Sequence, residues 1–374
     1  MTGAARSLSP SERFDWLRLI RSENVGPITF YQLLARFGSA AAALEALPEI
    51  ARRGGRQRPL AIATKATVER ELEALAKAEA HLVAWGEPAY PPALAAVEDA
   101  PPVLAVRGHA DLLTRRAVAI VGARNASANG RRFARDIALQ LGGQKLVIVS
   151  GLARGIDGAA HEGSLPSGTI AVLAGGIDIV YPEENRELHE AIAERGALIA
   201  EMPVGMVPQA RHFPRRNRII SGISLGVLVV EAAVGSGSLI TARCALDQGR
   251  EVFAVPGSPL DPRCRGTNDL IRKGARLVES AADIMEELAP LLAVPLAERR
   301  RALFAGAAAG SLPDDAQLDQ AREAVLGLLS PSPIQVDELV RQCHLSPALV
   351  MTALLELELA GRIERQPGNQ VALL

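Results

Sequence analysis

The chain contains 374 residues, enough for two or three domains of ordinary size. Hydrophobic residues make up 48% of it and charged residues 22%, a globular balance that excludes a largely disordered chain. The formal net charge is −1, from 41 basic and 42 acidic residues, so any site for nucleic acid has to be a local basic patch.

The sequence carries no clear targeting or metal-binding signal. Its longest uncharged run, residues 163–177, is interrupted by Pro166 and glycines and is shorter than the roughly 18 apolar residues that a transmembrane helix needs. The first residues lack the apolar core of a signal peptide. The cysteines have no CxxC spacing, which disfavours a zinc site or a disulfide framework. We therefore expect a cytoplasmic protein with no metal, no cofactor and no membrane contact.

The first 80 residues are rich in alanine and are predicted to form a small helical domain. An amphipathic run from Phe30 to Phe37 ends at Gly38, a natural stop for a helix. A further helix is predicted over residues 67–80. Residues 81–108 are rich in proline, and we interpret them as an entry connection carrying short strands.

From Ala117 onward, short apolar runs alternate with helical stretches. The predicted strands are Ala117–Val121, Leu146–Val149, Thr169–Leu173, Ala197–Ala200, Gly226–Val230 and Glu251–Val255. Continuous apolar runs of this kind are typical of parallel strands that are covered on both faces by helices. The predicted fold class is α/β, with a Rossmann-like, doubly wound parallel sheet in an extended domain over residues 81–288.

The last part of the chain is predicted to form a linker, residues 289–317, and a winged-helix domain, residues 318–374. Helices over Leu318–Leu329, Val336–Cys343 and Pro347–Ala360 are followed by a short hairpin, an order typical of a winged helix. The third helix contains no Arg or Lys, whereas readers of the major groove need base-edge donors and nearby cations. A contact with protein, including another part of this chain, is favoured over DNA reading.

Glycines and polar residues cluster directly after most of the predicted strands. The clusters are Gly122–Ser127, Ser150–Asp157, Ala174–Asp178, Gly235–Thr241 and Pro256–Ser258. Ligands of open parallel sheets bind at the carboxyl ends of the strands, so these loops are expected to line one crevice. Because glycines and helix N-termini suit anions, the ligand is expected to carry phosphate. Neither GxGxxG nor GxxxxGK[ST] occurs, which disfavours a dehydrogenase or a nucleoside triphosphatase.

An arginine-rich segment lies between the fourth and fifth predicted strands. Residues 211–218 read Arg-His-Phe-Pro-Arg-Arg-Asn-Arg, and no acidic residue occurs from Met202 to Val230. Guanidinium groups suit phosphate, and the ring of Phe213 could stack on a base. Together with Arg124 in the first loop, this segment predicts a short positive groove for a flexible strand. A solvated basic turn is the alternative.

Candidate catalytic groups are few. Asp157, His161, Asp178 and Glu231 could act in acid–base chemistry, but no nucleophile and base have a recognisable spacing. Asp157 and His161 are one helical turn apart, which predicts a hydrogen bond between them. Asp157 and Glu231 are also expected to hold loops by accepting backbone N–H bonds. We assign no catalytic residue.

These loops, in this order, resemble the DNA-processing protein A family, DprA, also called Smf. The resemblance covers residues 81–288. It rests on these segments: Tyr90–Pro92, Ile120–Arg124, Ser150–His161, Ala171–Asn185, Phe213–Ser221, Glu231–Thr241, Val255–Gly257 and Gly266–Asn268. It implies a non-enzymatic, homodimeric protein that binds single-stranded DNA, protects incoming DNA and loads the RecA recombinase in natural transformation.

The resemblance also implies the residues of the site. The DNA contacts would be Arg124, Arg215, Arg216 and Asn217, with Phe213 and the loop Ser236, Gly237 and Ser238 as neighbours. Where the family's first loop usually reads Gly-Ser-Arg, this chain has Gly122-Ala123-Arg124, so one hydroxyl donor is absent. The segment from Val25 to Ser39 resembles half of a helix-hairpin-helix or SAM-like unit.

Two other classes of function remain open at this level. Nucleotide-processing enzymes of the phosphoribohydrolase type share a similar glycine-rich loop, and there Asp157 or Glu231 would act on a ribosyl bond. Their Gly-Gly-x-Gly-Thr-x-x-Glu loop is absent, because Gly235–Thr241 contains no acid. The third possibility is a protein-interaction scaffold whose crevice has lost its ligand.

Overall fold

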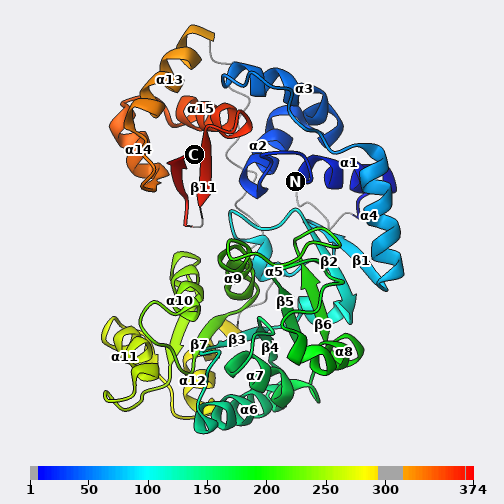
Figure 1. Cartoon of the computed structure of the whole chain (residues 1–374). Helices are drawn as coiled ribbons and strands as arrows, with labels where there is room; N and C mark the ends of the chain where they lie inside the picture. The colour runs from blue at the N-terminus through cyan, green and yellow to red at the C-terminus, as the bar shows by residue number, and fades with distance from the viewer. Residues whose placement is uncertain (1–6, 294–314, 367) are drawn as a thin grey trace. The chain divides into compact units, whose positions relative to one another are not determined.

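The computed structural model describes residues 7–293, 315–366 and 368–374 (Figure 1). The chain divides into two compact units. Of the described residues, unit 1 contains residue 7 and residues 71–293, and unit 2 combines residues 8–70 with residues 315–366 and 368–374. Most of the predicted linker, residues 289–317, lies outside the described residues. Its two ends are helical, since α12 (Ala281–Ala293) includes residues 289–293 and α13 (Asp315–Leu328) includes residues 315–317.

Unit 1 is built on a sheet of nine strands in the order β1-β2-β6-β5-β4-β3-β7-β8-β9. The six predicted strands are confirmed, with small shifts at their ends: β3 (Ala117–Val121), β4 (Val147–Ser150), β5 (Thr169–Leu173), β6 (Ala197–Ala200), β7 (Gly226–Val229) and β8 (Glu251–Ala254). All six run parallel. A short strand, β9 (Arg276–Leu277), pairs parallel with β8.

The predicted parallel sheet is confirmed, and two further strands extend it at one edge. β1 (Ala80–Ala84) and β2 (Val103–Gly108) come from the proline-rich segment and join the sheet antiparallel, with β2 pairing against β6. A parallel connection between them would need a crossover of a dozen or more residues, usually through a helix. The link contains only the four-residue α5 (Pro92–Ala95), so β1 and β2 pair as antiparallel neighbours.

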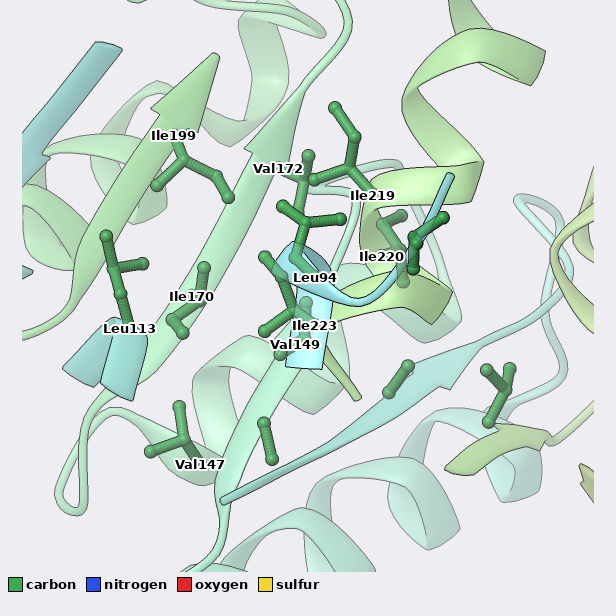
Figure 2. Packing of buried hydrophobic residues seen from close by; sticks show 14 of the residues in the cluster. Leu94, Leu113, Val147, Val149, Ile170, Val172, Ile199, Ile219, Ile220 and Ile223 are labelled. Carbon is green, nitrogen blue, oxygen red and sulfur yellow. The ribbon is translucent and has the colours of Figure 1, made fainter. Parts of the chain in front are cut away.

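Successive residues of the buried strands face opposite layers of helices. Ala119 and Val121 of β3 pack on the side of α9 (His212–Ile223) and α10 (Gly237–Asp247), whereas Val118 and Ile120 pack on the side of α6 (Ala128–Gly143) and α7 (Ile156–Ser164). Figure 2 shows the first layer, where Ile219, Ile220 and Ile223 of α9 and Leu94 of α5 lie against Val149 and Val172 of the sheet. The remaining helices of unit 1 are α8 (Arg186–Arg195) and α11 (Arg265–Arg272).

The winding of the chain reverses at β3. The chain leaves β3 outward through β4, β5 and β6, and then returns so that β7 pairs with the other side of β3. In doubly wound sheets, this reversal opens a crevice at the carboxyl ends of the two strands. The loops after β3 and β7 are the ones that the sequence predicts to bind a ligand.

The N-terminal part of unit 2 is helical, as predicted. It contains α1 (Pro10–Ile20), α2 (Pro27–Phe37), α3 (Ala40–Arg53) and the start of α4 (Lys65–Lys77), up to Arg70. α2 ends at Gly38, whose φ of 76° is the left-handed conformation typical of a helix stop. The helix predicted over residues 67–80 ends earlier, at Lys77, because Glu79 has a φ of 54° and Ala80 joins β1.

The C-terminal part of unit 2 is a winged helix, as predicted. α13, α14 (Val336–Cys343) and α15 (Pro347–Leu359) are followed by β11 (Ile363–Gln366) and β12 (Gln370–Leu373). A short strand that the sequence pattern did not predict, β10 (Ile334–Gln335), completes a sheet of order β10-β12-β11. The apolar residues of the three helices and the sheet form one core.

Candidate functional site

An open groove of about 780 Å³ lies where the winding of the sheet reverses. Its walls come from the loops after β3, β4 and β7 and from the first turns of α9 and α10. Seven predicted site residues line it: Arg124, Phe213, Arg216, Asn217, Ser236, Gly237 and Ser238. The eighth, Arg215, is exposed on α9 and is not among the lining residues.

Phe213 is the centre of one wall. The guanidinium carbon of Arg124 lies 5.2 Å from the centroid of its ring, and that of Arg216 lies 5.9 Å away. The ring of Tyr181 is tilted against it at a centroid distance of 5.7 Å. A cation within about 6 Å of an aromatic face is attracted by the ring quadrupole. The half-buried ring therefore holds the exposed Arg124 side chain at the groove.

Arg216, unlike the exposed Arg124, is bonded to the main chain of the sheet. Its side chain is buried, and Nη1 donates to the carbonyl of Gly151 at the end of β4 (2.5 Å) and to that of Val172 in β5. Burial lowers the pKa of Arg216 to about 10, although the carboxylate of Asp157 opposes this shift. Arg216 thus fastens α9 to two strand ends.

The far wall of the groove is the start of α10. Ser236 caps this helix by accepting from the backbone N–H of Ser238 (3.4 Å), and Asn217 donates from Nδ2 to the carbonyl of Gly237 (3.2 Å). A Cβ at Gly237 would meet no atom within 4 Å. The first turn of α10 is therefore tied to α9 and open to the groove.

The carboxylate of Glu231 lies at the N-terminus of α6 and bonds to its capping residue, Ser127. It accepts from the backbone N–H of Ser127 (2.9 Å) and from its hydroxyl (2.6 Å). A Cβ at Gly130 would lie 2.6 Å from Oε1 of Glu231, so any larger side chain there would displace the carboxylate. The prediction that Glu231 holds a loop is confirmed.

Asp157 holds the loop after β4 by accepting from the backbone N–H groups of Gly151 (3.2 Å) and Ala153 (3.4 Å), which confirms the second loop-holding prediction. Burial raises the pKa of Asp157, and the nearby Arg216 counteracts part of this rise. Asp157 and Glu231, two of the three candidate acid–base carboxylates, are therefore engaged by the protein's own main chain.

The predicted hydrogen bond between Asp157 and His161 is wrong. Asp157 lies in the first turn of α7 and turns back to the loop amides, whereas Nδ1 of His161 contacts the hydroxyl of Thr169 (2.8 Å). That hydroxyl donates to the carbonyl of Ile148 (2.7 Å), so it accepts from Nδ1–H of His161. Burial, together with the charge of Arg216, lowers the pKa of His161 to about 3, which keeps the ring neutral.

Two further arginines are placed differently from what the sequence cluster predicts. Arg218 is buried and pairs with Glu201 and Asp99, outside the groove lining. Arg263, which sequence reasoning missed, lines the groove and is held by Asp261 (2.8 Å). Its placement depends on the segment after β8 folding back, because Ala232 donates its N–H to the carbonyl of Arg263 (2.7 Å). No local sequence pattern indicates that contact.

Among the residues that the structure describes, no three His, Cys, Asp or Glu side chains are grouped to hold a metal ion. Within those same residues, no helix has the length and apolar character needed to cross a membrane.

Fold and site define a Rossmann-like protein with an arginine-bearing groove at the sheet reversal and two small helical modules. Family models agree with this division. The model described as DNA recombination-mediator protein A matches residues 81–289, a DprA-like N-terminal HHH domain matches residues 10–74, and a DprA winged helix domain matches residues 309–369. The chain therefore belongs to the DprA (Smf) family.

Individual relatives agree with the family models. The chain is 40% identical to Protein Smf of Escherichia coli over 310 residues, which cover 82% of this chain and 81% of the relative. It is 48% identical to DNA processing protein DprA of Bacillus subtilis over 202 residues, which cover 53% and 68%.

Solved structures give the same result for the fold. DprA of Streptococcus pneumoniae superposes with a TM-score of 0.64 at 34% identity, covering 75% of this chain and 99% of that one. DNA processing protein A of Helicobacter pylori gives a TM-score of 0.52 at 28% identity, covering 57% and 96%. The H. pylori structure is described as giving insight into a single-stranded DNA binding mode.

Proposed function

We propose that this protein binds single-stranded DNA in the groove at the sheet reversal. The observation that carries the proposal is the meeting of an exposed arginine, Arg124, an aromatic ring, Phe213, and the open start of α10 around one groove. The H. pylori relative, whose structure concerns single-stranded DNA binding, supports the same ligand class.

Each part of the groove has a separate role in this proposal. Arg124 and Arg215 contact phosphates, because a planar guanidinium binds phosphate oxygens in pairs. Ser236, Gly237 and Ser238 add donors at the start of α10, where the helix dipole favours an anion. Phe213 offers a face to a base. Arg216 and Asn217 position α9, since their polar atoms bond to the main chain of neighbouring elements.

The proposed contacts favour a flexible strand over a stiff duplex. The groove brings its cation and ring together within a few ångströms, and a single strand can bend so that both a phosphate and a base reach them. Phosphate contacts carry no sequence information, so weak sequence preference is expected. Dimerisation would multiply the contacts along one strand.

The wider role that we propose is the one that the resemblance to the DprA (Smf) family implies. The protein would act in the cytoplasm as a homodimer, protect incoming single strands and load the RecA recombinase onto them in natural transformation. We propose no enzymatic activity for this site. Asp157 and Glu231, the two acids that a phosphoribohydrolase-like reaction would use, are already bonded to main-chain N–H groups.

The test is fluorescence-anisotropy binding of a labelled single strand and of the matching duplex across a salt series. We expect preference for the single strand, a loss of about tenfold or more in Arg124→Ala and in Arg215→Ala, and a log–log salt slope of about −0.7 per phosphate contacted. Arg132→Ala, an exposed arginine on α6 that does not line the groove, is the matched control.

Two results decide the proposal. Equal binding of single strand and duplex, with Arg124→Ala and Arg215→Ala both unaffected, would overturn the groove as the DNA site. For the RecA role, we expect the protein to accelerate recombinase assembly on a single strand and expect Arg124→Ala to abolish that acceleration. Normal acceleration by Arg124→Ala would contradict the link between groove and loading.

A further inference from the structure

The third helix of the winged helix, α15, is apolar on both of its sides. One side belongs to the core of the winged helix itself, through Val350, Ala353, Leu354 and Leu357. Leu355 and Leu359, on the other side, belong to the core of the N-terminal helices, where their neighbours include Phe30 and Leu33 of α2. α15 is thus shared between two cores of unit 2.

Hydrogen bonds also connect α15 with the N-terminal helices. Thr29 of α2, which is fully buried, donates from Oγ1 to Oε2 of Glu358 (2.5 Å), and Arg365 donates to the same oxygen from Nε (2.9 Å). Asn24 donates from Nδ2 to the carbonyl of Leu359 (3.3 Å) at the end of α15. Because an unsatisfied buried carboxylate is costly, Glu358 is matched to this interface and not to open solvent.

A glycine marks the closest approach of the two parts. Gly54 ends α3 with a φ of −68°, a conformation that any residue adopts, so its backbone does not require glycine. A Cβ there would lie 2.0 Å from the carbonyl oxygen of Glu356 in α15 and 2.8 Å from the Cβ of Ala360. The small side chain is needed only because α15 packs at this point.

The interface covers two surfaces that could otherwise contact DNA: the last helix of the winged helix, α15, and the start of α2. In helix-turn-helix proteins the last helix enters the major groove. Here, on α15, both acids are buried and the helix has no basic residue. The start of α2, where helix N–H groups would suit a phosphate, faces Glu358, whose Oε1 lies 3.8 Å from the Cβ position of Gly26.

We infer that α15 is a dedicated docking helix for the N-terminal helices of the same chain, and that unit 2 is a closed module that does not bind duplex DNA. The partner of this surface is a helical domain with an apolar face, and that partner is already present within the chain. The inference does not rest on the proposed DNA groove, which belongs to unit 1.

The experiment uses the full chain with Gly54→Leu, which inserts a side chain against α15. Gly327→Leu is the matched control, because Gly327 is exposed on α13 with no atom within 4 Å of its Cβ position. Hydrogen–deuterium exchange is followed in residues 26–37 and 347–360. We expect exchange there to become at least tenfold faster in Gly54→Leu and to be unchanged in Gly327→Leu.

Binding of a labelled duplex separates docking from masking. For Gly54→Leu we expect duplex affinity within twofold of the unaltered chain, because the released helix offers no cation. A tenfold gain in duplex affinity would overturn the inference, since it would identify α15 as a DNA reader held in a masked state. Unchanged exchange in Gly54→Leu would overturn it as well, by showing that α15 does not dock there.

A milder variant guards against simple misfolding. Asn24→Gly introduces a residue that also tolerates the φ of 57° at this position, and it removes the hydrogen bond to the carbonyl of Leu359. We expect a two- to fivefold increase in exchange at the end of α15. Unchanged exchange in this variant would count against the docking contact. Single-strand binding by the same variants reports separately on unit 1.

Discussion

Two helix starts on either side of the sheet reversal, those of α6 and α10, have similar sequences and different surroundings. Each follows a glycine-containing loop and is capped by a serine, Ser127 or Ser236. At α6 the carboxylate of Glu231 bonds to Ser127 and fills the space beside Gly130. At α10 the cap bonds only within its own turn, and Gly237 faces open space.

This difference shows why a glycine-rich turn after a strand is weak evidence for a phosphate site. A helix start attracts any anion, and the protein's own carboxylate satisfies it as well as a ligand does. Near α7, Asp157 engages the loop amides of Gly151 and Ala153 in a similar way. Of these three helix starts, α10 is the one where the described side chains supply no carboxylate.

The largest effect is expected from removing the cation near Asp157. In Arg216→Ala the buried Asp157 loses its countercharge, and two strand-end carbonyls lose their donor. Breaking a buried charge pair typically costs about 3–5 kcal/mol, which we expect as a loss in the free energy of unfolding measured with urea. The neighbouring exposed Arg215→Ala should change it by less than about 0.5 kcal/mol. Similar stabilities of the two variants would contradict this division of roles.

The next largest effect is expected from emptying the α6 start. Glu231→Ala removes the acceptor of two hydrogen bonds from Ser127, and bonds to charged groups contribute about 1.5–3 kcal/mol each. We expect a loss of about 3 kcal/mol in urea unfolding, the lower end of the sum for two such bonds, and weaker single-strand binding, since the loop carrying Arg124 loosens. Glu231→Gln, which keeps one acceptor, should lose less than half as much. If the two variants were equally stable, the carboxylate would not be what holds this loop.

Acid should destabilise the protein through His161, which is fully buried in α7. Its folded-state pKa of about 3 is below the ordinary value of 6.5, so the unfolded chain takes up the proton first as the pH falls. The contribution of the neutral His161 to the free energy of unfolding is complete above pH 6.5. As the pH falls from 6.5 toward 3, the free energy of unfolding decreases by about 1.4 kcal/mol per pH unit. His161→Asn keeps an N–H for Thr169 and cannot titrate, so its unfolding free energy should fall less between pH 6.5 and 5. Parallel pH profiles would refute this origin of the acid sensitivity.

The smallest effects compare two glycines in the first turns of the two helices. Gly130→Ala places a methyl group against Glu231 and should cost about 1–2 kcal/mol, as overpacked sites do. Gly237→Ala has room and should change the free energy of unfolding by less than about 0.5 kcal/mol. Because that methyl group enters the groove, we expect it to weaken single-strand binding two- to fivefold in the anisotropy assay. Equal destabilisation by the two substitutions would mean that the two helix starts do not differ as described.

Much of the fold could be predicted because its signals are local. Each buried strand is a continuous apolar run, and Gly38 ends α2 where the periodicity ends. The antiparallel edge could not be predicted, because it depends on β2 pairing with β6, a strand far along the chain. The third strand of the winged helix, β10, has two residues and leaves no pattern.

The location of the groove could be predicted from the sequence, whereas the arrangement of its side chains could be predicted only in part. The arginine cluster and the loop after β7 do meet at one groove, as the position of the loops at strand ends implies. The sequence could not separate Arg215, which is exposed, from Arg216, which is buried, because adjacent residues on a helix differ only through the packing of that helix. Arg263 reaches the groove through a fold-back that no short pattern encodes.

The shared helix α15 has a mechanical consequence. α1 and β12 lie near opposite ends of the sequence, yet both belong to unit 2. A force that pulls these two elements apart is carried first by the contact of α15 with α2 and α3. The residues between them, including the whole nine-stranded sheet, bear no load until that contact ruptures. Stretching a single molecule from these two points should therefore give an early rupture that releases the chain, followed by a separate unfolding of the sheet.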